Sequence, residues 1–188
     1  MQNPGEEIVG AYLKIGLKCE FVEYNLQTPD IQGEIDVIGI NIKDKKLYVC
    51  EAATHMVTGM QYVNNKINQP DNINRFVKKF EKDIAFAKKY FADYDKIFML
   101  WSPIVKNQSQ KAKHNQTRDI QEICKQIKKR TGYDLEVIMN EKYLTCLEDL
   151  RKHAARETKE LKSPILRLMQ IEEKLKRHLL KLSRPAVD

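Results

Sequence analysis

Two acidic residues stand inside apolar runs of the sequence, and they are the first candidates for chemistry. Asp36 lies in the run GEIDVIGI (33–40), and Glu51 ends the run LYVCE (47–51). An ionised carboxylate is costly to bury unless it is paired with a cation. The polar turn KDKK (43–46) separates the two runs. A β-hairpin about this turn would place the two acids on neighbouring strands.

The alternation of side chains along a strand predicts that these two acids share one site. Successive residues point to opposite faces of a sheet, so Asp36 and Glu51 can lie close enough to hold one divalent cation. Mg²⁺ is commonly held by one or two carboxylates with waters and phosphate oxygens, and the carbonyl of Ala52 can add a ligand. Such an ion activates water and neutralises charge on a phosphodiester. The alternative is a structural ion pair with Lys or Arg and no catalytic role.

The order of motifs is similar to that of a nuclease superfamily. A helix that opens with GEE (5–7) is followed by GEIDVI (33–38), a turn, and an apolar strand that ends in an acid. Over roughly residues 5–103 this order resembles the PD-(D/E)XK nucleases, most closely the restriction-endonuclease-like and Holliday-junction-resolvase-like branches. The resemblance implies an endonuclease, dependent on Mg²⁺ or Mn²⁺, that hydrolyses DNA in restriction, defence or repair.

The resemblance also implies roles for single residues. Asp36 matches the first metal-binding acid, and Glu51 matches the acid of the (D/E)XK element. Glu6 matches the first-helix glutamate that reaches the metal through water, with Glu7 as the neighbouring candidate. The lysine expected two positions after Glu51 is missing, because Ala53 stands there. In the family that lysine orients or deprotonates the attacking water, which alanine cannot do.

One explanation is that the lysine has moved to another segment. On the predicted helix at 71–94, Lys79 lies at the edge of the apolar stripe and can reach toward the hairpin, whereas Lys78 points away from that stripe. Lys66 lies in the preceding segment. We therefore expect Lys79 to replace the missing lysine as a catalytic residue.

Two further explanations stay open. His55, on the same strand face as Glu51, or the loop residue Gln61 can serve in place of the lysine. Otherwise the site is inactive, and the chain is a nucleic-acid-binding or interaction domain that keeps the fold.

The rest of the chain predicts a mixed α/β domain. We expect helices at 5–17, 71–94, 117–131, 141–160 and 164–182, and strands at 19–26, in the hairpin, at 96–103 and at 134–140. The segment 61–72 is predicted to be a loop or an irregular helix start. Together with the resemblance, this indicates a restriction-endonuclease-like sheet with an αβββαβ core. The domain would span 1–188, with 141–188 as a helical extension.

Charge is unevenly distributed along the 188 residues. Residues 1–100 hold 13 Lys and Arg against 14 Asp and Glu, and residues 101–188 hold 20 against 12. A basic excess favours a polyanionic partner, and we expect DNA rather than RNA. The candidates for phosphate contact lie in and after the polar loop 106–116, namely Lys106, Lys111, Lys113 and Arg118. The alternative for these residues is a solvated loop.

Aromatic side chains are a second candidate for contact with bases. Trp101 and Tyr62 can stack on a base, but Trp101 ends an apolar strand, so we expect it in the core. The helix at 164–182 carries more apolar side chains than a solvated helix needs. It is expected to close the core or to form a seam in a homodimer.

The remaining features of the sequence concern the cellular compartment of the protein. The four cysteines show no CxxC pairing, which favours buried thiols over a zinc site. No run approaches the roughly 20 apolar residues of a membrane span, and no secretory signal is recognisable. We therefore expect a cytoplasmic protein without a membrane partner.

Overall fold

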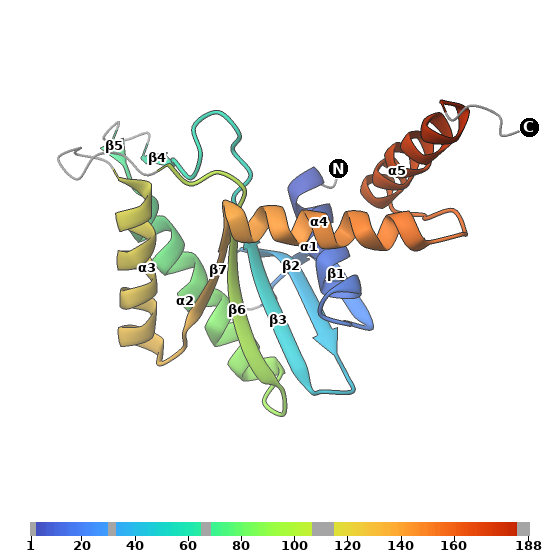
Figure 1. Ribbon diagram of the computed structural model, residues 1–188. Coiled ribbons are helices and arrows are strands. Elements are labelled where there is room, and N and C mark those ends of the chain that lie inside the picture. The colour runs from blue at the N-terminus through green and yellow to red at the C-terminus, as the bar shows by residue number, and fades with distance from the viewer. Residues whose placement is uncertain (1–2, 30–32, 65–68, 107–114, 184–188) are drawn as a thin grey trace, which may run out of the picture.

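A computed structural model describes residues 3–29, 33–64, 69–106 and 115–183 of the protein. Within these ranges the fold is an α/β arrangement, a five-stranded mixed sheet flanked by five helices (Figure 1). The elements follow in the order α1 (Pro4–Ile15), β1 (Phe21–Gln27), β2 (Glu34–Asn41), β3 (Lys46–Ala52), β4 (Val63–Asn64), β5 (Gln69–Pro70), α2 (Asn72–Tyr90), β6 (Asp95–Ser102), α3 (Gln116–Thr131), β7 (Leu135–Met139), α4 (Glu141–Arg156) and α5 (Pro164–Leu182).

The main sheet has the strand order β1-β2-β3-β6-β7. The first three strands pair antiparallel, and β3, β6 and β7 run parallel through the crossover helices α2 and α3. Short links suffice for the antiparallel strands, whereas the parallel strands need the helical crossovers. Since β3 is central and covered on both faces, its residues 47–51 are all buried, which accounts for the continuous apolar character of residues 47–50.

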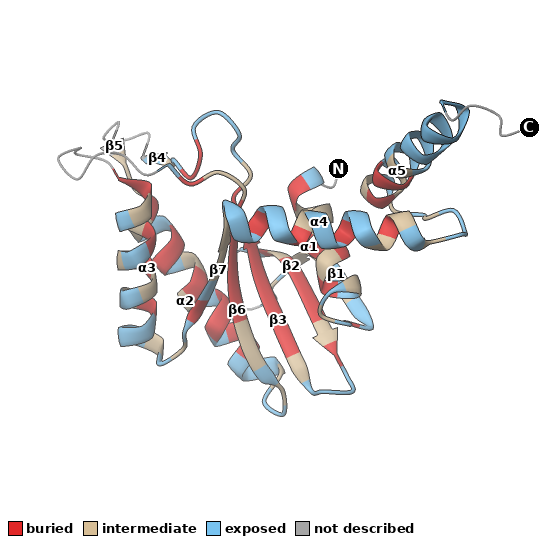
Figure 2. Ribbon diagram, viewed as in Figure 1, coloured by how far each residue is buried: buried red, intermediate tan, exposed pale blue. Residues whose placement is uncertain are grey.

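Helices cover both faces of the sheet, and alternation along β3 divides the core between them (Figure 2). Leu47, Val49 and the following Ala53 belong to the core beneath α2 and α3. Tyr48 and Cys50 belong to the core that α1 and α4 close on the other face. Glu51 has the parity of Val49, so its side chain points toward α2.

The two helices that border the site have clear causes in the sequence. Asn3 caps α1, and a capping box joins it to Glu6, with Pro4 in the first turn. In α2 the stripe of Phe76, Phe80 and its apolar neighbours is buried against the sheet. The sequence therefore determines which face of α2 meets the strands.

Three differences from the predicted elements are larger than a shift of two residues. The segment expected to be a loop or an irregular helix start contains the short antiparallel pair β4–β5. The helix expected to run to residue 94 ends at Tyr90, because Phe91 leaves helical geometry after a last hydrogen bond to Ala87. The helix expected to run to residue 160 ends at Arg156, since Glu157 adopts an extended backbone.

Several residues follow the expectation of burial. Trp101 is fully buried and makes edge-on contacts with Tyr12 and Tyr143, so the prediction that it lies in the core is confirmed. All four cysteines are free thiols. None of the helices in the described part of the chain has the length and apolarity to cross a membrane.

Helix α5 is buried over only part of its length. Leu166 and Met169 pack with residues of α1 and α4, whereas a second row of apolar side chains is exposed. This row consists of Leu168, Ile171, Leu175, Leu179, Leu180 and Leu182. The inner residues close a core, as expected, and a seam between two copies stays a prediction that would use the exposed row.

Candidate active site

Asp36 of β2 and Glu51 of β3 lie on either side of a lysine ammonium. Nζ of Lys79, from α2, is 2.9 Å from Oδ1 of Asp36 and 2.5 Å from Oε2 of Glu51. The other Asp36 oxygen accepts a 2.8 Å hydrogen bond from the N–H of Ala52. The structure therefore brings together the two predicted metal ligands and the predicted substitute lysine. Their chemical roles stay predictions.

The register of the hairpin explains why the two acids meet. In the antiparallel ladder Val37 pairs with Cys50. Asp36 and Glu51 are the next residue on each strand, so they lie at the same level of the sheet. Their side chains are 16% and 3% exposed, and that of Lys79 is 29% exposed. Glu51 thus forms the buried end of the group, and Lys79 forms the end nearest to solvent.

A third acid, Asp83, completes the group and was missed by the sequence reasoning. It lies one helical turn after Lys79 on the same edge of the α2 stripe, and it is buried. Its carboxyl group interacts electrostatically with that of Glu51, and neither Oδ2 of Asp83 nor Oε1 of Glu51 receives a donor from the described residues. The signal that could have found it was the spacing of Lys79 and Asp83, four residues apart beside an apolar stripe.

Burial determines the protonation of the two inner acids. Burial raises the pKa of Glu51 well above its usual range, repulsion from Asp36 and Asp83 raises it further, and Lys79 opposes the rise. Burial also raises the pKa of Asp83 to about 7, against the opposing effects of Lys79 and of its interaction with Glu51. Both carboxyl groups therefore hold a proton to a higher pH than an exposed acid does.

The lysine stays charged in this environment. Burial by itself would lower the pKa of Lys79, but attraction to Glu51 and Asp36 outweighs it and raises that pKa. The group therefore combines one ammonium with three carboxyl groups, and two of these, Glu51 and Asp83, have raised pKa values.

Replacing Asp83 with Asn is expected to make the protein more stable at pH 8 without metal, by about 2–4 kcal/mol. A folded-state pKa raised from 3.8 to about 7 means that the stability contributed by Asp83 is full below pH 4 and is lost as the pH rises to 7. The Asp83→Asn variant does not lose folding stability in this way as the pH rises. Urea unfolding in EDTA at pH 5 and pH 8 measures the difference. Glu81→Gln, on the same helix and paired with Arg130, is the control. A difference between Asp83→Asn and wild type that is constant with pH would contradict the assignment.

A polar cavity of about 480 Å³ opens beside the acids and the lysine. Its wall includes Glu6 near the start of α1, His55 and Tyr62 from the segment after β3, and Arg75 of α2. The carboxylate of Glu6 accepts hydrogen bonds from Asn25 and from the N–H of Asn3. Glu6 therefore shares the cavity with the hairpin acids, as expected.

The other candidates for the role of the missing lysine are placed differently. His55 lines the cavity and contacts the ring of Tyr62 edge-on. Gln61 is exposed and is not part of the cavity wall. Lys78 is exposed and contacts neither acid, and Lys66 falls outside the described residues. Of the four candidates that the structure describes, including Lys79, only Lys79 contacts both carboxylates.

Glu7, the neighbouring candidate on the first helix, has a structural partner instead. Its carboxylate accepts a 2.8 Å hydrogen bond from the hydroxyl of Ser163 and a longer one from the N–H of Ile165. It therefore connects α1 to the start of α5 and does not line the cavity.

Of the residues predicted to contact phosphate, the two that the structure describes, Lys106 and Arg118, do not line this cavity. The ammonium of Lys106 donates a 2.6 Å hydrogen bond to the carbonyl of Val57 and so connects two loops. Arg118 is exposed in the first turn of α3. Lys111 and Lys113 lie outside the described residues. The proposed contact of these four with nucleic acid stays a prediction.

The oxygens of the site suit a hard divalent cation. Oε1 of Glu51 is buried and receives no donor from the described residues, and the Lys79 ammonium already places positive charge between Asp36 and Glu51. Within the described residues, no group of three or more His, Cys, Asp and Glu side chains is arranged to hold a metal. A metal here would rely on two carboxylates with water and phosphate oxygens, as Mg²⁺ commonly does.

Comparison with known proteins adds no relative to this description. No protein-family model matches the sequence, and no curated protein matches it significantly.

Proposed function

We propose that the protein is a metal-dependent endonuclease of the PD-(D/E)XK type that hydrolyses phosphodiester bonds of DNA. The observation that carries the proposal is the contact of Lys79 with both Asp36 and Glu51 at the wall of a polar cavity. These are an acid pair and a lysine, as the resemblance requires, although the lysine comes from a different element. Apart from the separate short pair β4–β5, the elements follow in the order α1-β1-β2-β3-α2-β6, which is the order of the αβββαβ core that the resemblance implies.

Asp36 and Glu51 would hold the metal, Mg²⁺ or Mn²⁺, and Glu6 would contact its water ligands from α1. The bound ion supplies an activated water and neutralises charge on the phosphodiester. The Ala52 N–H holds one oxygen of Asp36, so the carboxylate is oriented before substrate arrives. Asp83 is buried and interacts electrostatically with Glu51, so it would be a positioning residue.

Lys79 would take the role of the lysine that is missing at position 53. Ala53 is 1% exposed and packs in the core beneath α2, so a longer side chain there would have to displace core residues. Lys79 reaches the same two acids from α2 and not from β3. Its ammonium would orient the attacking water and offset the charge of the phosphate in the transition state.

The direct test is cleavage of DNA with and without divalent metal. We expect supercoiled plasmid to be nicked or linearised in Mg²⁺ or Mn²⁺, and to stay intact when EDTA is present. Duplex, single-stranded and junction DNA, with RNA in parallel, would define the substrate. Cleavage that persists in EDTA would overturn the metal assignment. No cleavage of any of these substrates would overturn the nuclease.

One observation favours a second candidate, a binding domain without catalysis. The short contacts of Lys79 with both acids also satisfy the definition of a buried structural ion pair. In that case the protein would bind nucleic acid equally well in EDTA and in Mg²⁺, and no metal would bind between Asp36 and Glu51. A titration with Mn²⁺ that is monitored by calorimetry separates the two candidates.

A further inference from the structure

A second cleft lies along α2 and joins the cavity that contains the acids. Its volume is about 320 Å³, and its wall includes Arg75, Lys78, Lys79 and Lys82. Arg75 and Lys79 also line the first cavity, as does Glu34. The two hollows therefore meet at these three side chains, and a ligand can extend from one into the other.

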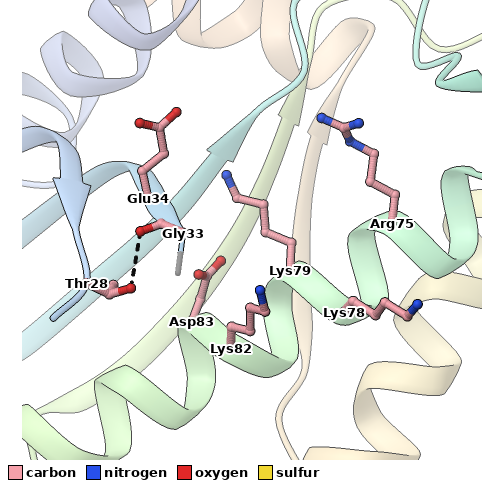
Figure 3. A pocket seen from close by; sticks show the side chains of 8 residues that line it. All are labelled: Thr28, Gly33, Glu34, Arg75, Lys78, Lys79, Lys82 and Asp83. Carbon is pink, nitrogen blue, oxygen red and sulfur yellow. Dashed lines mark hydrogen bonds between the residues drawn. The ribbon is translucent and has the colours of Figure 1, made fainter. Parts of the chain in front are cut away.

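The cations of this cleft form one stripe on α2. Positions 75, 78, 79 and 82 follow the i, i+3, i+4, i+7 pattern, which places them on one side of a helix. Figure 3 shows Arg75, Lys79 and Lys82 extending from the helix, with Lys78 directed away from Lys79. From Arg75 to Lys82 the helix rises by about 10 Å. This rise corresponds to roughly three nucleotides of a DNA strand.

The charges of the cleft leave a positive excess. Lys79 is matched by Asp36 and Glu51, and Glu34 accepts a hydrogen bond from Gln27. The other acid of the wall, Asp83, is buried. Among the described residues of the wall, four cations therefore stand against two acids, and three of the cations, Arg75, Lys78 and Lys82, are exposed.

Arg75 is held where the two hollows meet. Its guanidinium lies over the ring of Tyr62 at 4.2 Å from the ring centroid. This contact orients a planar donor that suits a phosphate oxygen pair. The arrangement differs from a set of lysines on an open surface, because one cation is oriented and the others line a hollow.

We propose that this cleft binds the backbone phosphates of the DNA strand next to the phosphate at Lys79, through Arg75, Lys78 and Lys82. The inference rests on the proposed function for the identity of the ligand, and it adds the path of the strand. It also places the phosphate contacts in the half of the sequence that has no basic excess, away from the loop 106–116 that composition favoured.

The test uses binding under conditions where no hydrolysis occurs. Fluorescence anisotropy of a labelled DNA duplex, titrated with the full chain in EDTA over a range of KCl concentrations, measures how log K depends on log salt. Lys78→Ala/Lys82→Ala changes two exposed residues that lie outside the cavity of the acids. We expect weaker binding and a salt slope reduced by roughly 1 to 2, since each phosphate contact contributes about 0.9.

A matched control comes from α3. Lys125 and Lys129 are exposed and have the same four-residue spacing, so Lys125→Ala/Lys129→Ala removes equal charge elsewhere. The inference is supported if this control keeps the wild-type slope while the α2 double variant loses it. Equal slopes for the two double variants, or no binding by the wild type, would overturn it.

Cleavage assays separate this inference from the proposed nuclease. If the wild type cuts DNA, Lys78→Ala/Lys82→Ala should raise KM at least about fivefold and leave kcat within about twofold, because the changes weaken ground-state binding. Normal KM in the variant would overturn the cleft alone. If the wild type never cuts DNA but Lys78→Ala/Lys82→Ala still reduces the salt slope of DNA binding, the cleft is supported and the proposed nuclease is overturned.

Discussion

Replacing Glu51 with Gln is expected to lower the rate of metal-dependent DNA cleavage by at least about 10³-fold. Glutamine keeps the size of the side chain and removes the charge that a divalent cation needs. Glu51 is the most buried of the acids that face the cavity, so no solvent-exposed side chain can take its place as a metal ligand. Initial rates on plasmid in Mn²⁺, together with calorimetric titration of Mn²⁺, measure both losses.

The same substitution should leave the fold intact or make it more stable. Glu51 is buried with a raised pKa, and a neutral amide at this position can donate to Asp83. Loss of activity therefore cannot be ascribed to unfolding if the unfolding free energy is unchanged or higher. Glu136→Gln, an exposed strand acid on β7, is the matched control and should cleave at the wild-type rate. Wild-type cleavage by Glu51→Gln would rule out this site.

Replacing Lys79 with Met is expected to lower cleavage by about 10²–10³-fold. In metal-free buffer it should also destabilise the protein by about 3–5 kcal/mol, because Asp36 and Glu51 lose the cation between them. The methionine keeps the apolar stem of the lysine and removes only the ammonium. Cleavage rates and urea unfolding in EDTA measure the two effects.

Added metal gives a third measurement on the same variant. A divalent cation that binds between the acids stabilises the folded state in proportion to its affinity. We expect Mn²⁺ to raise the melting temperature of Lys79→Met more than that of the wild type, since the ion no longer competes with the ammonium. Lys88→Met, further along α2 and outside both hollows, should behave as the wild type. Full activity of Lys79→Met would contradict the proposed role of Lys79 and favour His55, the other candidate in the cavity wall.

Much of the fold follows from local patterns in the sequence. The apolar run 96–103 predicts a strand covered on both faces, and β6 lies inside the sheet between β3 and β7. The polar turn at 43–46 predicts the pairing of β2 with β3, and that register places Asp36 level with Glu51. The stripe of α2 predicts which side chains are buried. The pair β4–β5 was not predictable, because two-residue strands have no periodicity to detect.

The roles of the residues around the acids depended on the tertiary structure. The sequence by itself determined that two strand acids lie together and that Lys79 stands at the edge of an apolar stripe. It favoured Lys79 over Lys78 but left His55 and Gln61 open, because the choice depends on how α2 crosses the hairpin. Lys79 and Asp36 are 43 positions apart in the chain.

Only the packed arrangement of α2 on β2 and β3 made Asp83 a partner of Glu51 and joined the two hollows at Arg75. The physical reason is that periodicity reports which face of an element is apolar, whereas the side chains at the edge of that face meet partners that the helix–sheet crossing selects.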